Sequence, residues 1–340
     1  MAHVLVTGAT GFIASHCIVK LIERGHTVRG TARSTTRATA LNMILSDYTE
    51  KTIEVPLVAA DLSRDTGWQE AVDGVDAILH VASPFPASLP RDPEELIRPA
   101  RDGALRVLKA ARIAGVERVV MTSSQAAVAY GWGENRPAML TEEHWSNPDN
   151  LADNTPYTRS KTIAERAAWD YVAGEGEGLK LTTINPSLVL GPVMGGGFSA
   201  SLEIVTQLMS GKLPAVPRMG FQVVDVRDVA EAHILALENE ASIGQRYLVA
   251  DDYLWMLELA EILREAFSDY AKKIPSGQLP NWLVRVLSLF NPPLRQILPE
   301  LGKRRMVSSD KARKELGWSP ISAKDAAIAS GRSLIAHKVV

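Results

Sequence analysis

Cysteine is almost missing from this chain: its 340 residues include only one, Cys17. A single cysteine cannot form an internal disulfide, and no CxxC, HExxH or Cys/His cluster offers the ligand spacing of a metal site. The sequence therefore predicts no bound metal, and it favours a reducing compartment, the cytoplasm. Cys17 falls in an expected helix, where a small buried apolar side chain is the simplest interpretation.

An excess of charge of one sign is also missing. The chain has 39 Asp+Glu and 37 Lys+Arg, which gives a formal net charge of −2. So small a charge does not create the field that gathers nucleic acid or an anionic membrane surface. We therefore expect neither nucleic acid nor a membrane as a partner.

Long hydrophobic runs are absent as well. The longest uncharged stretch, residues 181–202, is broken by Pro186, Pro192 and three glycines at 195–197, so it cannot form a membrane-spanning helix. The first residues form an apolar, strand-like run without the basic start or cleavage site of a signal peptide. Neither a transmembrane segment nor a secretory leader is expected.

The composition is otherwise that of a globular protein, with 46% hydrophobic and 22% charged residues and a length that suits about two domains. Short β-rich runs alternate with longer helical segments in the first half, which is typical of βαβ units. The sequence predicts an α/β fold with a doubly wound Rossmann parallel sheet. The expected strands are 3–7, 27–31, 53–59, 77–81, 118–122 and 180–185, and the expected helices are 12–24, 37–46, 67–72, 93–114 and 157–173.

The alternation stops after about residue 186, where Pro/Gly-rich loops lead into amphipathic helices at 254–267 and 283–289. A strand-like run at 221–226 suggests that the chain returns to the sheet, and we expect a ligand cleft at the carboxyl edge of that sheet. The prediction is a Rossmann domain and a smaller, mostly helical substrate domain that are interleaved. They comprise residues 1–185 plus 221–250, and residues 186–220 plus 251–340.

A turn with two glycines joins the first expected strand to the first helix, and it reads Gly8-Ala9-Thr10-Gly11-Phe12-Ile13-Ala14. Gly8 allows a tight turn, and Gly11 lets the backbone approach a pyrophosphate at the helix N-terminus. The spacing also fits a turn without a ligand, but this junction is where a dinucleotide fold binds phosphate. We predict cofactor contacts at Gly8, Thr10, Gly11, Phe12 and Ile13.

The second expected strand ends without a carboxylate, in Thr31-Ala32-Arg33-Ser34. In the NAD-binding version of the fold, an acidic residue near this point binds the ribose 2′-hydroxyl. Arg33 can instead bind a 2′-phosphate, with Arg37 as a second cation. The pattern favours NADPH over NADH, and a pair of solvated surface arginines is the alternative interpretation.

Tyr157 and Lys161 are four residues apart in a segment that begins like a helix, with Thr155 as N-cap and Pro156 at the first position. A phenol with a pKa of about 10 is a poor acid–base catalyst at neutral pH. An adjacent ammonium, a helix N-terminus and a nicotinamide cation each favour the phenolate, so we expect a lowered pKa for Tyr157. The spacing by itself also fits a chance Tyr/Lys pair on the surface.

Small hydroxyl residues end the fifth expected strand and support a catalytic interpretation. Ser124 is placed where a substrate carbonyl oxygen could accept its hydrogen bond, and a serine that caps backbone is the alternative. The loop after the sixth strand, residues 185–192, suits the nicotinamide face. Ser124, Tyr157 and Lys161 are the candidate catalytic residues.

Together these features resemble the extended short-chain dehydrogenase/reductases of the NAD-dependent epimerase/dehydratase superfamily, in particular the branch of dihydroflavonol reductases and methylglyoxal/carbonyl reductases. Two departures are Ala14 in place of a third glycine, and Gln125 where plant dihydroflavonol reductases typically have alanine. The matching segments follow in order along nearly the whole chain. They are 7–14, 31–34, 61–62, 80–84, 122–124, 157–161, 185–186, 224–230 and 311–318.

The resemblance implies an NADPH-dependent aldehyde or ketone reductase. Hydride would pass from NADPH to the carbonyl carbon while Tyr157 protonates the oxygen, Ser124 polarises it, and Lys161 lowers the pKa of the tyrosine and holds the nicotinamide ribose. Further cofactor contacts are implied along the strand ends and in the second half of the chain. They are Asp61, Leu62, Val81, Ala82, Ser83, Thr122, Pro186, Leu188 and Ser201, with Ser199 as a rival to Ser201.

The substrate is expected to be a small carbonyl compound, hydrophobic or aromatic, in a pocket that includes Phe85, Gln125 and Val128. A nucleotide-sugar epimerase or dehydratase is one alternative, but those enzymes usually retain NAD, which Arg33 argues against. A non-catalytic NADP-binding regulatory protein is another, and the complete catalytic set argues against it. The family includes monomers and dimers, so either a monomer or a homodimer is expected.

Overall fold

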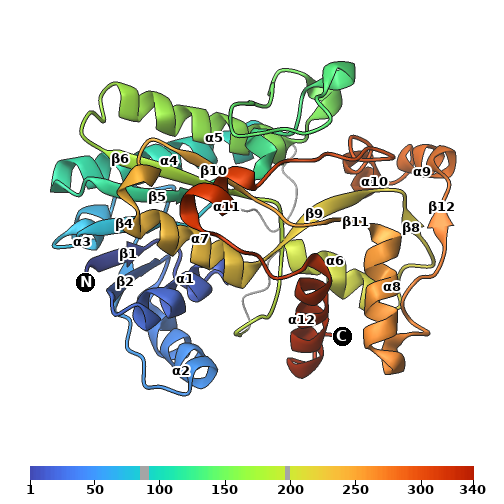
Figure 1. The fold of residues 1–340 in the computed structure, drawn as a ribbon, viewed down its shortest axis with the longest axis horizontal. Helices are drawn as coiled ribbons and strands as arrows, with labels where there is room; N and C mark the ends of the chain where they lie inside the picture. Colours follow the sequence, from blue (N-terminus) through green and yellow to red (C-terminus); the bar gives the residue numbers. More distant parts are fainter. Residues whose placement is uncertain (85–91, 196–199) are drawn as a thin grey trace.

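The central element of the molecule is a seven-stranded sheet, seen in a computed structural model that describes residues 1–84, 92–195 and 200–340 (Figure 1). Its order is β10-β6-β5-β4-β1-β2-β3, and all neighbouring strands are parallel. The predicted doubly wound Rossmann sheet is therefore confirmed. The strands are β1 (His3–Val6), β2 (Thr27–Ala32), β3 (Leu57–Ala59), β4 (Ala77–His80), β5 (Arg118–Thr122), β6 (Lys180–Pro186) and β10 (Arg246–Val249).

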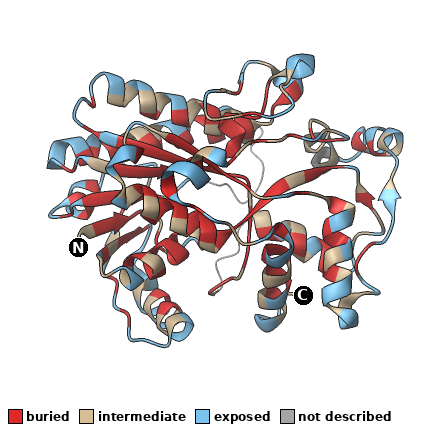
Figure 2. Cartoon of the chain, in the orientation of Figure 1, coloured by how far each residue is buried: buried red, intermediate tan, exposed pale blue. Residues whose placement is uncertain are grey.

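Helices cover both faces of this sheet and make three layers (Figure 1). Each helical layer packs its own apolar cluster against the sheet, with Ile18 and Leu45 fully buried in one cluster and Val107 in the other. Figure 2 shows the sheet strands mostly buried, as expected for parallel strands covered on both faces. One layer contains α1 (Phe12–Glu23), α2 (Ala38–Thr49) and α7 (Val226–Glu238), and the other contains α3 (Trp68–Val72), α4 (Glu94–Ala114) and α5 (Pro156–Ala173).

The strand-like run at 221–226 does form a strand, but the prediction that it returns to the Rossmann sheet is wrong. This strand, β9 (Gly220–Asp225), lies in a separate sheet between β7 (Leu188–Leu190) and β11 (Tyr253–Trp255). The chain returns through α7, which packs against α1, and through β10, which pairs with β6. Apolar patterning identifies a strand without identifying its partner, because pairing is decided by tertiary contacts.

The third strand is shorter than predicted. Residues 53–56 were expected to begin it, yet β3 covers only Leu57–Ala59. The backbone N–H of Ile53 donates to Ser46 Oγ at 2.9 Å, and that of Val55 donates to Asn42 Oδ1 at 3.0 Å. Side chains of α2 thus satisfy backbone groups that a longer strand would have paired.

Most of the remaining helices and strands build a smaller second part of the molecule around the three-stranded sheet. Within it, α12 packs against α6, α8 and β9, and β8 pairs with β12. The helices predicted at 254–267 and 283–289 correspond to α8 and α9. The elements of this part are α6 (Ala200–Met209), β8 (Val216–Pro217), α8 (Met256–Ala266), η6 (Ser268–Tyr270), β12 (Gln278–Leu279), α9 (Asn281–Ser288), α10 (Pro292–Gln296) and α12 (Ala323–Ala336). Helix α11 (Asp310–Leu316) packs instead against α7 and β10 of the Rossmann part. Other 3-10 turns of the described residues lie between elements of the Rossmann part, and they are η1 (Thr35–Arg37), η2 (Gln125–Ala127), η3 (Gly133–Asn135), η4 (Leu151–Asp153) and η5 (Glu240–Ser242).

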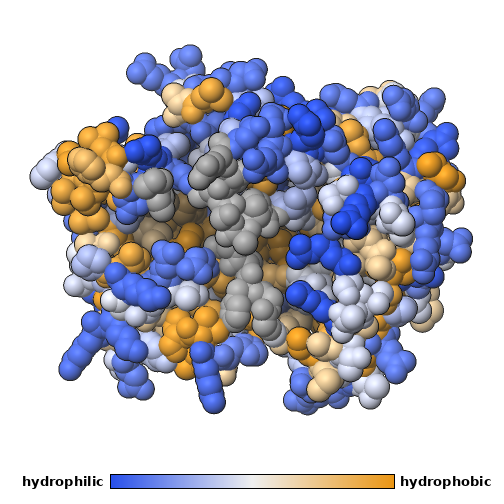
Figure 3. Space-filling model, turned by 180° about the vertical axis from the view of Figure 1, so that it is seen from behind, coloured by the Kyte–Doolittle hydropathy of each residue, from blue (hydrophilic) through white to orange (hydrophobic). Residues whose placement is uncertain are grey.

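Exposed apolar side chains gather at one end of this second part. Trp282, Leu289 and Phe290, on α9 and just after it, are 66%, 64% and 84% exposed. Figure 3 shows a hydrophobic area at the upper left, which is the end of the molecule where α9 lies. None of the helices in the described part of the chain is both long and apolar enough to cross a bilayer.

Candidate active site

The first two turns of α5 carry Tyr157 and Lys161. Thr155 caps the helix: its Oγ accepts a hydrogen bond from Thr158 N at 3.2 Å, and Thr158 Oγ accepts one from Thr155 N at 2.9 Å. The predicted N-cap is confirmed, with Pro156 at the first helical position. This capping box fixes where the helix begins, and Lys161 Nζ lies 5.9 Å from the centre of the Tyr157 ring.

Ser124 meets Tyr157 from the end of β5. The Ser124 side chain hydrogen-bonds the tyrosine hydroxyl, and its Oγ also accepts a hydrogen bond from Ala126 N at 3.1 Å, which caps η2. The serine is therefore both a backbone cap and a neighbour of the tyrosine. The three candidate catalytic residues lie together at the carboxyl edge of the sheet.

Burial raises the pKa of Tyr157, and the hydrogen bond with Ser124 lowers it only in part. The direction is opposite to the one expected from the neighbouring lysine and the helix start. Loss of solvent outweighs those two influences because the phenolate is the charged form. A raised pKa keeps the phenol protonated at neutral pH, which is the state that a proton donor needs.

Lys161 connects α5 to the loop that follows β4. Its Nζ donates a hydrogen bond to Ser83 Oγ at 3.0 Å. Burial lowers the pKa of Lys161 to about 8, while the negative charge of Glu165 acts to raise it. The neighbouring His80 is neutral near pH 7, because burial and the charge of Lys161 lower its pKa to about 3. Its Nδ1 is 2.9 Å from Thr7 Oγ.

The glycine turn follows β1, which is next to β4 at the point where the strand order of the sheet reverses. In open α/β sheets, ligands bind at the carboxyl edge beside such a point. Gly8 has a φ of +66°, and a Cβ there would be 3.0 Å from Ala82 Cβ. Both the backbone conformation and the lack of space therefore disfavour a side chain at this position. Gly11 precedes α1 without a side-chain cap. The first N–H groups of α1 therefore suit an anion, as a dinucleotide pyrophosphate requires.

The two predicted 2′-phosphate ligands follow β2. Arg33 and Arg37 are both exposed, and Arg37 ends the turn η1 just before α2. Asp61, predicted to contact adenine, is close enough that the charge of Arg33 contributes to lowering the pKa of its carboxyl group, after the stronger hydrogen bonds from Ser63. Arg33 and Asp61 thus come together although they are far apart in the sequence.

The other predicted cofactor residues are spread over several strand ends. Ala82 N donates to Thr7 Oγ at 3.0 Å, which ties the loop after β4 to the glycine turn. The Thr122 hydroxyl is 2.7 Å from His233 Nε2 and so is directed to α7. The positions of the remaining residues are given by their elements: Thr10, Phe12 and Ile13 are at the start of α1, Leu62 and Val81 follow β3 and β4, Pro186 ends β6, Leu188 begins β7, and Ser201 is in α6.

Phe85, which is expected in the substrate pocket, lies outside the described residues, and so does Ser199, the rival to Ser201 as a cofactor contact. Gln125 is 6% exposed, and its Oε1 is buried without a hydrogen-bond partner among the described residues. Val128 is fully buried in the apolar cluster on which Tyr157 packs. Gln125 is thus a polar group that still needs a donor, whereas Val128 is part of the packing.

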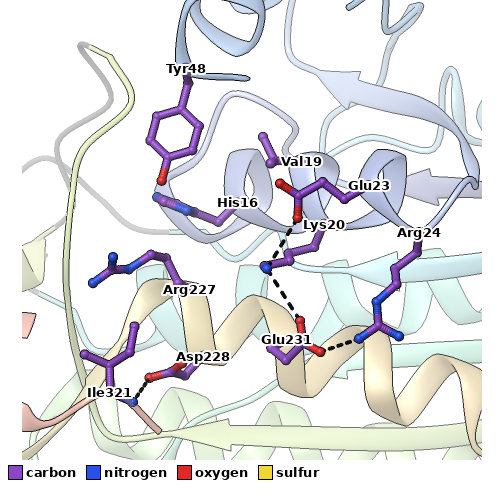
Figure 4. Close-up of a pocket in the computed structure, with 10 residues that line it drawn as sticks. All are labelled: His16, Val19, Lys20, Glu23, Arg24, Tyr48, Arg227, Asp228, Glu231 and Ile321. Carbon is purple, nitrogen blue, oxygen red and sulfur yellow. Dashed lines mark hydrogen bonds and ion pairs between the residues drawn. The ribbon is translucent and has the colours of Figure 1, made fainter. Parts of the chain in front are cut away.

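A pocket of about 500 Å³ opens elsewhere, between α1 and α7 (Figure 4). It contains none of the predicted site residues. Its charged side chains neutralise one another, since Lys20 pairs with Glu23 at 3.3 Å and with Glu231 at 3.7 Å. Asp228 Oδ2 accepts a hydrogen bond from Ile321 N at 2.7 Å. This pocket is distinct from the candidate active site.

Sequence reasoning missed a group of buried polar residues where α5 packs on strands β6 and β10. Glu165, Asn185 and Arg246 are 0%, 1% and 8% exposed. A signal for one of them was present, since Glu165 follows Lys161 by one helical turn and so lies on the same face of α5. Among the described residues, no group of three His, Cys, Asp or Glu side chains could hold a metal ion.

Comparison with known proteins decides the family. The model of the "NAD dependent epimerase/dehydratase family" matches residues 4–250. The chain belongs to this family. Its relatives include cinnamoyl-CoA reductase 1 of Arabidopsis thaliana, 38% identical over 269 residues that cover 78% of this chain and 75% of the relative. Another is dihydroflavonol 4-reductase of Zea mays, 33% identical over 274 residues, with 78% and 75% covered.

A similar solved structure is that of the yeast methylglyoxal/isovaleraldehyde reductase complexed with NADPH. It has a TM-score of 0.80 and 28% sequence identity, and the match covers 99% of this chain and 100% of the yeast chain. The family resemblance expected from the motifs is thereby confirmed over the Rossmann part and beyond it.

Proposed function

We propose that the protein is an NADPH-dependent carbonyl reductase that converts an aldehyde or ketone to an alcohol. The observation that carries the proposal is the meeting of Ser124, Tyr157 and Lys161 at the same sheet edge as the glycine turn. The reductases named above, one of them a complex with NADPH, support the same assignment.

When bound, the cofactor supplies a hydride to the carbonyl carbon of the substrate. Tyr157 then delivers its phenolic proton to the carbonyl oxygen, so that one hydride and one proton make the alcohol. The Ser124 hydroxyl donates a hydrogen bond to the same oxygen and stabilises its developing charge. Lys161 stabilises the phenolate left on Tyr157, and its Nζ would hold the nicotinamide ribose.

The residues at the carboxyl edge of the seven-stranded sheet fit NADPH. The pyrophosphate would lie at the glycine turn and the start of α1, where Gly8 and Gly11 leave the backbone open. Arg33 and Arg37 would bind the 2′-phosphate, with Asp61 and Leu62 at the adenine. The loops after β4 and β6, from Val81 to Ser83 and from Pro186 to Leu188, would line the ribose and the nicotinamide, with Ser201 as a further contact.

For the substrate we propose a small hydrophobic or aromatic carbonyl compound that binds between the Rossmann part and the second part, the one built around the sheet of β7, β9 and β11. Gln125 Oε1 would accept a hydrogen bond from a hydroxyl group of such a compound, since it is buried without a described donor. Phe85 and Val128 would complete the pocket. We further propose a monomer or homodimer in the cytoplasm.

NADPH oxidation with a panel of aromatic and aliphatic aldehydes and ketones tests this function. We expect cofactor consumption that matches alcohol formation for at least one class of carbonyl compound, and much slower turnover with NADH. NADPH binding without turnover of any carbonyl would indicate a regulatory protein instead. A tightly retained NAD together with conversion of a nucleotide sugar would indicate an epimerase.

A further inference from the structure

The Glu165 carboxylate lies fully buried at the centre of a hydrogen-bond network that joins three strands to α5. Oxygen Oε1 accepts hydrogen bonds from Arg246 Nε at 2.7 Å, Thr183 Oγ at 3.2 Å and Trp169 Nε1 at 3.3 Å. Oxygen Oε2 accepts from Asn185 Nδ2 at 2.6 Å and from the Ser123 hydroxyl. A buried carboxylate needs such a complete set of donors, so the site is built around its charge.

Two of these donors are directly connected to the catalytic serine. Ser123 is its neighbour in the chain, and Asn185 Nδ2 also donates to the Ser124 carbonyl oxygen at 3.2 Å. Glu165 therefore holds the backbone of Ser124 from the β5 side and from the β6 side. Asn185 is also next to Pro186, so the same contact fixes the start of the loop proposed to line the nicotinamide.

Glu165 also follows Lys161 by one turn of α5, and its negative charge acts on that ammonium group. Among the described residues, the other ionisable groups near Lys161 are Tyr157, on the same helix, and His80, at the end of β4. Both are neutral at pH 7 because burial holds the phenol protonated and the imidazole unprotonated. The buried side chains of α4, which packs along α5, are apolar or small.

Behind Glu165, the opposing charge is the guanidinium of Arg246 on β10. Its Nη1 donates to the carbonyl oxygens of Glu142 and His144 at 2.6 and 3.0 Å, and it stacks on the Trp145 ring at 3.6 Å. These contacts fix the arginine, which in turn orients the carboxylate. Burial raises the pKa of Glu142, a further acidic group beside the arginine.

We infer that Glu165 is a positioning residue of the active site, which fixes Ser124 through Ser123 and Asn185 and helps to keep Lys161 protonated. The inference rests on the proposed reductase function. It assigns to the carboxylate two separable effects, one on the geometry of the serine and one on the charge of the lysine.

Glu165→Gln tests both effects, because it keeps the size of the side chain and removes its charge. Without that charge the pKa of Lys161 falls further. In a plot of kcat for carbonyl reduction against pH, the alkaline limb, where kcat falls as Lys161 loses its proton, should therefore move to lower pH by about half a unit or more. The misplaced serine should lower kcat about tenfold, while KM for NADPH stays within about twofold. A lower kcat with an unmoved limb, or no change at all, would overturn the inference.

Glu165→Asp and Asp225→Asn serve as matched variants. Glu165→Asp keeps the charge but shortens the reach, so the limb should stay near its wild-type position while kcat falls; a shift as large as that of Glu165→Gln contradicts the role of the charge. Asp225 is also fully buried and paired with an arginine, Arg227 at 2.8 Å, but it lies in β9. Asp225→Asn should leave the limb unmoved, and a similar shift there would contradict a specific effect of Glu165.

Two milder substitutions test the inference if Glu165→Gln does not fold. Ser123→Ala and Trp169→Phe each remove one donor to Glu165, but only Ser123 is attached to the catalytic strand end. We expect Ser123→Ala to lower kcat severalfold and Trp169→Phe to leave it within about twofold of wild type. Equal effects of the two would overturn the positioning role.

A readout without turnover separates this inference from the proposed function. The pH dependence of Lys161 labelling by trinitrobenzenesulfonate, followed by peptide mass spectrometry, reports its pKa directly. A lower midpoint in Glu165→Gln than in wild type supports the inference even if no carbonyl compound is reduced, whereas equal midpoints contradict it. Absence of turnover in the wild type would overturn only the reductase function.

Discussion

At the scale of single residues, the site depends on which charges are buried and which are exposed. Tyr157 and Lys161 lose solvent on α5, and this raises the pKa of the phenol and lowers that of the ammonium group to about 8. Arg33 and Arg37 remain exposed beyond β2. The half-buried pair Tyr157 and Lys161 is suited to proton transfer, and the exposed pair Arg33 and Arg37 is suited to recognition of a phosphate that arrives from solvent.

Arg33→Asp should change the preferred cofactor. A carboxylate at this position repels the 2′-phosphate and can accept hydrogen bonds from the ribose hydroxyls, as in NAD-binding folds. We expect the ratio of kcat/KM for NADPH to that for NADH to fall by about two orders of magnitude, which corresponds to the loss of about 3 kcal/mol. Initial rates with the two cofactors measure this ratio, and an unchanged ratio would place the 2′-phosphate contact elsewhere.

At the scale of elements, the sequence predicted correctly those features that depend on neighbouring residues. The start of α5 followed from Thr155 and Pro156, because capping and proline at the first position involve adjacent residues. The partner of β9 did not follow from its residues, since pairing with β7 or with β6 is decided by contacts distant in sequence. The prediction that residues 53–56 begin the third strand was wrong for the same reason. The side chains of Asn42 and Ser46 on α2 accept hydrogen bonds from the backbone N–H groups of Val55 and Ile53.

Helix α9 offers a test of how an element is held at the edge of the fold. Val284 is fully buried, whereas Phe290 just after the helix is 84% exposed. Val284→Ala removes buried methyl groups and should lower the free energy of unfolding by about 2 kcal/mol. Phe290→Ser should change it by less than about 0.5 kcal/mol. Urea unfolding curves measure both, and a larger cost for Phe290→Ser would show that this ring is covered in solution.

At the scale of the whole molecule, the two parts are joined just before the start of α5, the helix that carries Tyr157 and Lys161. Asp153, just before α5, accepts hydrogen bonds from Lys303 Nζ at 2.6 Å and Arg305 Nη2 at 2.7 Å, so the segment after α10 is tied to the Rossmann part. Burial alone would raise the pKa of Asp153, but the hydrogen bonds and charges of Arg305 and Lys303 outweigh it and hold that pKa well below its usual range.

This ion pair should contribute to stability only where Asp153 is ionised. The pKa of Asp153 is lower in the folded protein than in the unfolded chain, where it is about 4. The contribution to stability is therefore complete above about pH 4 and is lost as the pH falls below it. Asp153→Asn should lower the free energy of unfolding by about 3 kcal/mol at neutral pH. The difference from wild type should shrink in acid, as followed by denaturant unfolding at several pH values, and a pH-independent difference would contradict the account.

The sequence predicted most of the candidate site because its residues follow strand ends in a known order. Gly8, Arg33 and Ser124 follow three separate strands, yet a doubly wound sheet brings all such strand ends to one edge. Tyr157 was found instead from its spacing to Lys161 at a helix start. The role of Gln125 and the network around Glu165 could not be predicted, because burial of a polar group depends on packing from every side. The direction of the pKa shift of Tyr157 was wrong for that reason too.

Transfer of a labelled hydride tests the central claim most directly. NADPH carrying deuterium on the transferred side of the nicotinamide C4 is mixed with a reducible carbonyl compound and either wild-type protein or Tyr157→Phe, and the alcohol is analysed by mass spectrometry. The account predicts deuterium on the carbinol carbon with the wild type. With Tyr157→Phe it predicts a rate lower by about two orders of magnitude or more, at nearly unchanged NADPH affinity. Equal rates of labelled alcohol formation by the two proteins would contradict it.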